Sequence, residues 1–158
     1  MKKKVKKKNL LVEVGKPMIF RHEANEKHNE VTVVKAQYAI PMKEITMALI
    51  PEVLDRVKKM SVGFPEANIT FNYQHSPAFL FTCKGKTERR GDDVPNQELG
   101  DKIALTKCEM QACKIGREIM IIVSKTLKEE AEYVLSISEF YGNQVNRGLS
   151  YIRKQQEI

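Results

Sequence analysis

The chain has 158 residues, of which 42% are hydrophobic and 30% are charged, and its formal net charge is +7. This composition is typical of a soluble globular protein of one domain, and no stretch approaches the roughly 18 apolar residues that a membrane span requires. The start of the chain lacks the apolar segment of a secretory signal. The cysteines are Cys83, Cys108 and Cys113, too few for a disulfide scaffold, which favours free thiols in the cytoplasm.

The basic character of the chain is concentrated in residues 1–8. Six of these are lysine, so the rest of the chain sums to 7 − 6 = +1. We expect a disordered tail here, because like charges repel one another and such a segment can bury nothing. Residues 9–158 are then expected to form a single domain. The lysines of the tail are Lys2, Lys3, Lys4, Lys6, Lys7 and Lys8.

Alternating apolar residues predict strands after the tail. One short run covers residues 10–14 and a second covers 18–20, separated by a Gly–Lys–Pro segment. A third strand is expected from Val31 to Ile40, after a polar loop and before Pro41. The short connections favour antiparallel order.

The period changes to that of a helix between Lys43 and Met60. Apolar residues there recur every three or four positions, which indicates an amphipathic helix. Pro51 is expected to kink or divide it, because proline lacks an amide donor. Gly63 and Pro65 are expected to end the element.

A β-hairpin is predicted next, since residues 69–73 and 79–83 alternate aromatic with polar side chains around a turn at 74–77. A polar, charged excursion follows over residues 84–95. The remaining third is expected to be helical, with one apolar stripe over 99–122 and a second over 127–152. We expect a break at 124–126, because Thr126 and Glu129 have capping-box spacing. The predicted fold class is α+β, a small antiparallel sheet packed against helices with a long helical C-terminal third.

Two groups of basic residues are candidates for nucleic-acid binding. The tail is a flexible polycation, which binds phosphate polyanions by releasing counterions; a solubilising tail, a localisation signal or contact with anionic lipid are the alternatives. The second group follows the hairpin, but Glu88, Asp92 and Asp93 lie within it. A solvated strand end with local ion pairs is therefore the favoured interpretation there. The members of this group are Lys84, Lys86, Arg89 and Arg90.

Metal binding and catalysis find little support in the spacing of residues. Cys108 and Cys113 are five positions apart on a predicted helix, so their thiols diverge by about 140°. His75 in the hairpin turn could approach Cys83, but no third group or oxyanion donor accompanies them. Glycine-rich phosphate loops are absent from the sequence. We expect neither a cofactor, a metal nor an enzymatic activity.

The segment from residue 83 to 112 resembles a strand, acidic turn and helix found in many small bacteriophage proteins. The resemblance lies in the run from Cys83 through Gly91–Asp92–Asp93 to a helix start at Gly100–Asp–Lys–Ile–Ala. It implies a phage or prophage origin rather than an activity, with Cys108 where alanine would be expected. The host cytoplasm is then the expected location.

The same region is similar, more distantly, to the second half of a double-stranded-RNA-binding domain. The turn at 74–77 contains histidine and proline, and the resemblance implies that Lys102 and Lys107 face phosphates. The sequence departs from that pattern, because Asp101 replaces a lysine and two further aspartates precede the helix.

Two functional hypotheses follow from these features. The first is a phage-encoded accessory protein that binds nucleic acid through its tail. The alternative is a protein-interaction module, such as a virion component, a homo-oligomer or an inhibitor of a host protein, that uses the C-terminal helix. That helix carries more apolar residues than one buried face needs. They are Phe140, Tyr141, Val145, Leu149, Tyr151 and Ile152.

Overall fold

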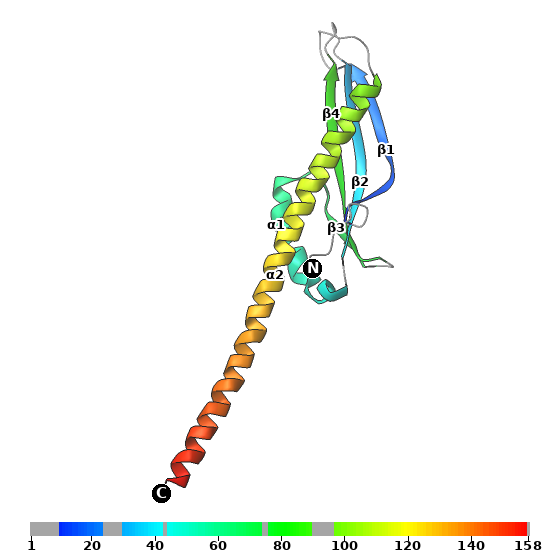
Figure 1. The fold of residues 1–158 in the computed structure, drawn as a ribbon. Coiled ribbons are helices and arrows are strands. Elements are labelled where there is room, and N and C mark those ends of the chain that lie inside the picture. The colour runs from blue at the N-terminus through cyan, green and yellow to red at the C-terminus, as the bar shows by residue number, and fades with distance from the viewer. Residues whose placement is uncertain (1–9, 24–29, 43, 74–75, 90–96, 158) are drawn as a thin grey trace.

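The computed structural model describes residues 10–23, 30–42, 44–73, 76–89 and 97–157 (Figure 1). Within these ranges the chain forms a four-stranded antiparallel sheet and two α-helices, so the predicted α+β class is confirmed. Two short 3₁₀ helices, η2 (Glu44–Leu49) and η3 (Ser61–Gly63), flank the first α-helix. The main elements are β1 (Val12–Glu23), β2 (Glu30–Pro41), α1 (Ile50–Met60), β3 (Thr70–Asn72), β4 (Ala78–Arg89) and α2 (Gln97–Gln156).

The sheet has the strand order β1-β2-β4-β3. The central strands β2 and β4 pair over their whole length, from Glu30 opposite Arg89 to Pro41 opposite Ala78. The edge strand β1 pairs with β2 but shifts register between Val14 and Met18, where Gly15 has a φ of 72°. This left-handed glycine lets the strand bulge and continue. The two short runs predicted at 10–14 and 18–20 therefore belong to one strand.

The predicted hairpin is confirmed, because β3 pairs with β4 from Thr70 opposite Leu80 to Asn72 opposite Ala78. Phe71 packs edge-on against Phe79 across the pair, with ring centroids 4.9 Å apart. The predicted polar excursion is wrong over residues 84–89, which continue β4. Pairing with β2 stabilises this extension, and the alternate exposed residues along it are charged. Residues 90–95 lie outside the described ranges.

The segment before β3 is helical in two parts, as the proline predicted. The 3₁₀ helix η2 ends at Leu49, and Pro51 occupies the first turn of α1. In that turn the missing amide of proline costs no hydrogen bond, because the first amides of a helix have no partner within it. The helix α1 buries Ile50, Val53 and Val57.

The predicted break at 124–126 is wrong, because α2 is one continuous helix of 60 residues, about 90 Å long. Thr126 does not cap a new helix. Its hydroxyl donates to the carbonyl oxygen of Ile122 at 2.9 Å and accepts a hydrogen bond from Arg56 at 3.0 Å. The side chain is thus satisfied inside the helix, where it is 1% exposed.

The core lies between the sheet and the first half of α2, with α1 closing one end (Figure 1). Alternate residues of β2 and β4, including Tyr38, Phe79 and Phe81, face α2. The helix lies directly on β4 at Gly85, where a Cβ would be 1.7 Å from the carbonyl oxygen of Ala104. None of the helices among the described residues combines the length and apolarity needed to cross a membrane.

Candidate interaction surfaces

The second half of α2 projects from the rest of the structure. From residue 127 to residue 156 no side chain is buried, and Ile137 alone among these is as much as half-buried. We call these 156 − 127 + 1 = 30 residues the arm, which at the rise of an α-helix is about 45 Å long. In Figure 1 the arm extends beyond α1 with no other described element beside it.

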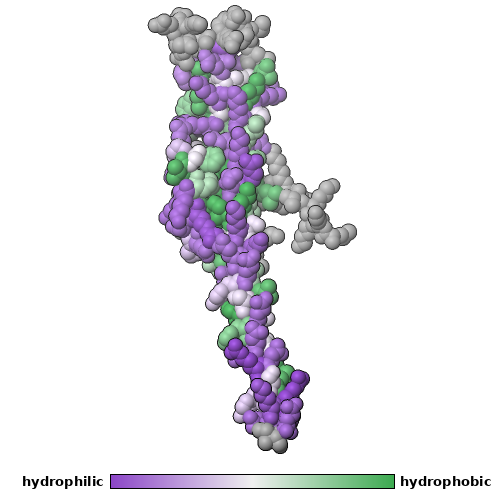
Figure 2. Space-filling view, turned by 90° about the vertical axis from the view of Figure 1, so that its left-hand side faces the viewer, coloured by the Kyte–Doolittle hydropathy of each residue, from purple (hydrophilic) through white to green (hydrophobic). Residues whose placement is uncertain are grey.

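One row of apolar side chains runs along the arm at the spacing predicted from the sequence. Val134 is 58% exposed, Val145 61% and Leu149 48%. Successive members are three or four residues apart, apart from the seven between Val134 and Tyr141, and this spacing places them on one face of the helix. Figure 2 shows hydrophobic side chains spaced along the arm among polar ones. This arm stripe comprises Leu127, Ala131, Val134, Tyr141, Val145, Leu149 and Ile152.

A second row on the arm is aromatic. Tyr133, Phe140 and Tyr151 are seven and eleven residues apart, so they share a face about 130° away from the arm stripe. All three are more than half exposed, and the ring of Phe140 contacts that of Tyr141 edge-on at 5.9 Å. The apolar residues of the C-terminal helix that exceed the needs of one buried face are thus exposed to solvent and are not part of the core.

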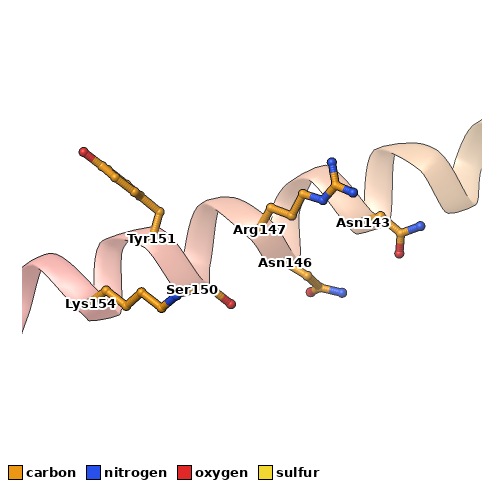
Figure 3. A pocket seen from close by; sticks show the side chains of 6 residues that line it. All are labelled: Asn143, Asn146, Arg147, Ser150, Tyr151 and Lys154. Carbon is orange, nitrogen blue, oxygen red and sulfur yellow. The ribbon is translucent and has the colours of Figure 1, made fainter.

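The remaining face of the arm is polar apart from the exposed Leu135. Near its end, polar side chains surround an open hollow on the surface of the helix (Figure 3). Every lining residue comes from the single helix α2, so the hollow lacks the enclosing walls of a small-molecule site. The lining residues are Asn143, Asn146, Arg147, Ser150, Tyr151 and Lys154.

Charge divides the arm into two halves of opposite sign. Residues 127–140 contain one lysine and four glutamates, which gives 1 − 4 = −3. Residues 141–156 contain Arg147, Arg153 and Lys154 and no carboxylate side chain, which gives +3, and Glu157 follows directly. The arm is therefore acidic near the folded body and basic toward its tip.

An apolar groove continues the line of the arm stripe onto the body. It has a volume of about 320 Å³ and is lined by Leu10, Ile40 and Pro41 on one side and by Cys113 and Met120 on the other. Cys113 and Met120 precede Leu127 by fourteen and seven residues, so all three lie on nearly the same side of α2. Along the body the face that carries the arm stripe thus forms one wall of a groove whose other wall includes β2.

A cluster around Arg56 fixes the base of the arm to α1. Its guanidinium donates to Glu129 at 2.6 Å and to Glu52 at 3.0 Å, in addition to Thr126. The hydrogen bond to Glu129 is the main cause that raises the pKa of Arg56. Glu129 lies about 160° around α2 from the arm stripe, so α1 is attached on the opposite side.

The basic residues predicted on β4 have partners from other elements. Lys84 pairs with Glu66 at 3.0 Å, and Arg89 pairs with Glu30 at 3.4 Å. The ion pairing favoured for this group is therefore present, although with carboxylates distant in sequence. Lys86 is exposed on the face of the sheet that points away from α2, because its neighbour Gly85 faces the helix.

The other predicted phosphate contacts are spread over different surfaces. Lys107 donates from Nζ to the carbonyl oxygen of Lys86 at 2.9 Å. Lys102 lines a hollow between β1 and α2 together with Lys16 and the carboxylates Glu98 and Asp101, of which Asp101 pairs with Arg21. Lys102 and Lys107 thus lie on α2, whereas Lys84, Lys86 and Arg89 lie on β4. Arg90 and the six lysines of the tail lie outside the described residues.

The thiols are in two environments. Cys83 and Cys108 are buried between β4 and α2, whereas Cys113 is exposed. Burial raises the pKa of Cys83 to about 12 and also raises that of Cys108, so both remain protonated at neutral pH. Among the described residues no three His, Cys, Asp or Glu side chains are placed to hold a metal ion. His75, the predicted neighbour of Cys83, lies outside the described residues.

No protein-family model matches this chain, and comparisons with curated proteins and with solved structures found no match. The exposed arm stripe and the opposite charges of the two halves of the arm are the features of the described residues that indicate an interaction surface. Sequence periodicity identified the stripe, but the predicted break at 124–126 concealed that α2 runs on as one projecting helix.

Proposed function

We propose that the protein is a protein-interaction module that docks through its arm against an α-helix of a partner. The observation that carries this proposal is the arm stripe, whose side chains are all exposed along a helix that is attached to α1 at its base, through Glu129. Helices in proteins gain most of their stability from packing an apolar face. Contiguous exposed apolar surface of this kind marks an interaction site, and its spacing suits a helical partner.

Site-specific photo-crosslinking in living cells tests this proposal. A photoreactive amino acid replaces Val145, in the middle of the arm stripe, in the full-length chain. A matched control carries the same amino acid at Asn143, which is exposed on the opposite face. We expect crosslinked protein adducts from position 145 and few from position 143, with the partner identified by mass spectrometry. Equal adduct formation at the two positions, or none at either, would refute docking through the stripe.

A second candidate function is the binding of a polyanion, of which nucleic acid is the main example, through the tail. The observation that favours it is the concentration of six of the +7 charges within residues 2–8. Flexible polycations bind phosphates without sequence preference and with steep salt dependence. An accessory protein acting in the host cytoplasm, as the phage resemblance implies, is compatible with either function.

Truncation of the tail tests this second candidate. A chain that begins at Asn9 behind a start methionine is compared with the full-length protein on duplex DNA, single-stranded DNA and duplex RNA over a range of salt. Loss of six phosphate contacts lowers the slope of log affinity against log salt by at most about 5 on duplex DNA. The control variant Lys84→Gln/Lys86→Gln removes two charges from the sheet and should leave the slope nearly unchanged. An unchanged slope after truncation contradicts a role for the tail.

A further inference from the structure

We propose that the partner of the arm is a second copy of this chain, docked in antiparallel orientation with its centre near residues 141 and 142. The inference rests on the proposed function of the arm and specifies what occupies the arm stripe. Two observations support it independently, the charge of the two halves of the arm and the order of residues along the stripe.

The charge distribution of the arm is complementary to itself only when the second copy is reversed. An antiparallel pair places the −3 half of each arm beside the +3 half of the other. A parallel pair would place −3 beside −3 and +3 beside +3. Packed helices lie about 8–10 Å apart, which is close to the Debye length at physiological salt, so these charges act on one another. Electrostatics therefore favours the antiparallel pair and opposes the parallel one.

Four of the seven residues of the arm stripe pair with one another in reverse order, and Tyr141 and Val145 pair with small residues outside the stripe. When the second copy is reversed about the midpoint between residues 141 and 142, each residue of one arm lies level with a residue of the other arm. The numbers of two residues at the same level add up to 283. Smaller side chains then face larger ones, as interdigitating helices require. The resulting layers pair Ala131 with Ile152, Val134 with Leu149, and Ser138 with Val145.

At the centre of the antiparallel pair, the bulkiest residue of the stripe lies next to a glycine that is not part of the stripe. Tyr141 of each copy lies level with Gly142 of the other under this reversal. A Cβ built at Gly142 meets nothing within 4 Å in the single chain, so no contact within the molecule accounts for a glycine there. Glycine inside a helix costs about 1 kcal/mol relative to alanine. In the pair, its missing side chain leaves space for the tyrosine of the second copy.

The folded body leaves room for the second helix. Arg56 holds α1 against Thr126 and Glu129, which lie about 100° and 160° around α2 from the arm stripe. The stripe side continues into the groove beside Met120, where Ile40 and Pro41 of β2 form the other wall, so β2 bounds it along the body but not along the arm. A second arm can therefore lie along the full 45 Å or so, with its tip near Leu127 and the two bodies at opposite ends.

The association itself is measured by sedimentation equilibrium of the full-length protein over a wide range of concentration. We expect a monomer–dimer equilibrium that Val145→Asp weakens by at least about 100-fold, because each dimer would then bury two carboxylates between the packed helices. The control Asn143→Asp introduces the same charge on the opposite face and should change the dissociation constant by less than about 3-fold, as surface substitutions do. A wild-type protein that stays monomeric at high micromolar concentration overturns the inference.

The orientation is measured by mixing two single-cysteine variants in a Cys113→Ser background, where Cys83 and Cys108 are buried. An antiparallel pair forms disulfides between Val134→Cys of one protein and Leu149→Cys of the other. Disulfides that form only between two copies of the same variant, or no disulfides at all, overturn the antiparallel arrangement.

The photo-crosslinking experiment separates the two proposals. Adducts of position 145 with another protein, for a chain that is monomeric alone, would retain the proposed function and reject self-association.

Discussion

The contact between α2 and β4 at Gly85 provides a sharp test of how the body is assembled. In Gly85→Ala the new Cβ would lie 1.7 Å from the carbonyl oxygen of Ala104 and 2.8 Å from the amide nitrogen of Cys108. Both atoms belong to the helix backbone, so no side-chain rotation relieves the overlap and α2 must move away from the sheet. Overpacking of a core costs about 1–3 kcal/mol when side chains can adjust, and we expect about 3 kcal/mol or more here.

The measurement is the free energy of unfolding from urea titration, together with the melting temperature by circular dichroism. For a chain of this size, 3 kcal/mol lowers the melting temperature by roughly 6–12 °C. Gly100→Ala is the matched control, because a Cβ there meets nothing within 4 Å and alanine favours the helix. If Gly85→Ala and Gly100→Ala are equally stable, α2 does not lie against β4 as described and the account of the core is wrong.

Further predictions concern the base of the arm and the buried thiols. Thr126→Val should destabilise the protein by about 1 kcal/mol in urea titration, because it removes a buried hydroxyl that bonds to Ile122 and Arg56, whereas the exposed Thr106→Val should have little effect. At pH 8 a maleimide should label Cys113 alone in the folded protein and all three cysteines in urea, and rapid labelling of Cys83 would contradict its burial. The free energy of unfolding should fall above pH 9.0, the ordinary cysteine value, by up to about 1.4 kcal/mol per pH unit for each buried thiol, because the folded chain then retains protons that the unfolded chain loses. Unfolding curves at pH 8 and pH 10 check this slope, which should persist in Cys113→Ser; a stability that rises over that range would contradict the sign.

Local patterns in the sequence were sufficient to predict the elements that depend on local chemistry. Alternating aromatic residues predicted the hairpin of β3 and β4, and Phe71 and Phe79 do meet across it. Pro51 marked the junction between η2 and α1, because the constraint of proline acts on its own turn of helix. These predictions succeeded because each pattern records a requirement that the neighbouring residues themselves impose.

The predictions that failed depended on contacts distant in sequence. Lys84 to Arg89 look like a loop by charge, but pairing with β2 makes them strand, and Arg89 gains Glu30 as an ion-pair partner. Thr126 and Glu129 have the spacing of a capping box, but both bind Arg56, seventy or more residues away. The local signal, for a loop in one case and for a helix start in the other, is real, and a tertiary contact outweighs it.

The candidate site could be predicted in part. The periodicity of residues 127–152 identified the arm stripe, since a helical row of apolar residues is visible without coordinates. The sequence could not show that this row is unburied, because exposure depends on where the body ends relative to α2. The opposite charges of the two halves are visible in the sequence. They can favour one orientation of a partner only if both halves lie along one continuous helix, which the sequence did not predict.

The two proposed activities occupy opposite ends of the sequence and make separable predictions. If arms pair, each dimer carries two tails and twelve tail lysines, 6 + 6, so binding to a long polyanion gains from effective concentration. Val145→Asp should then weaken binding to long duplex DNA but not to a duplex of about 10 base pairs, which is too short for both tails. Truncation of the tail should weaken binding to the long and to the short duplex and should leave dimerisation unchanged. The comparison uses fluorescence anisotropy at constant salt, and equal loss on long and short duplexes for Val145→Asp would show that the arm does not act through pairing.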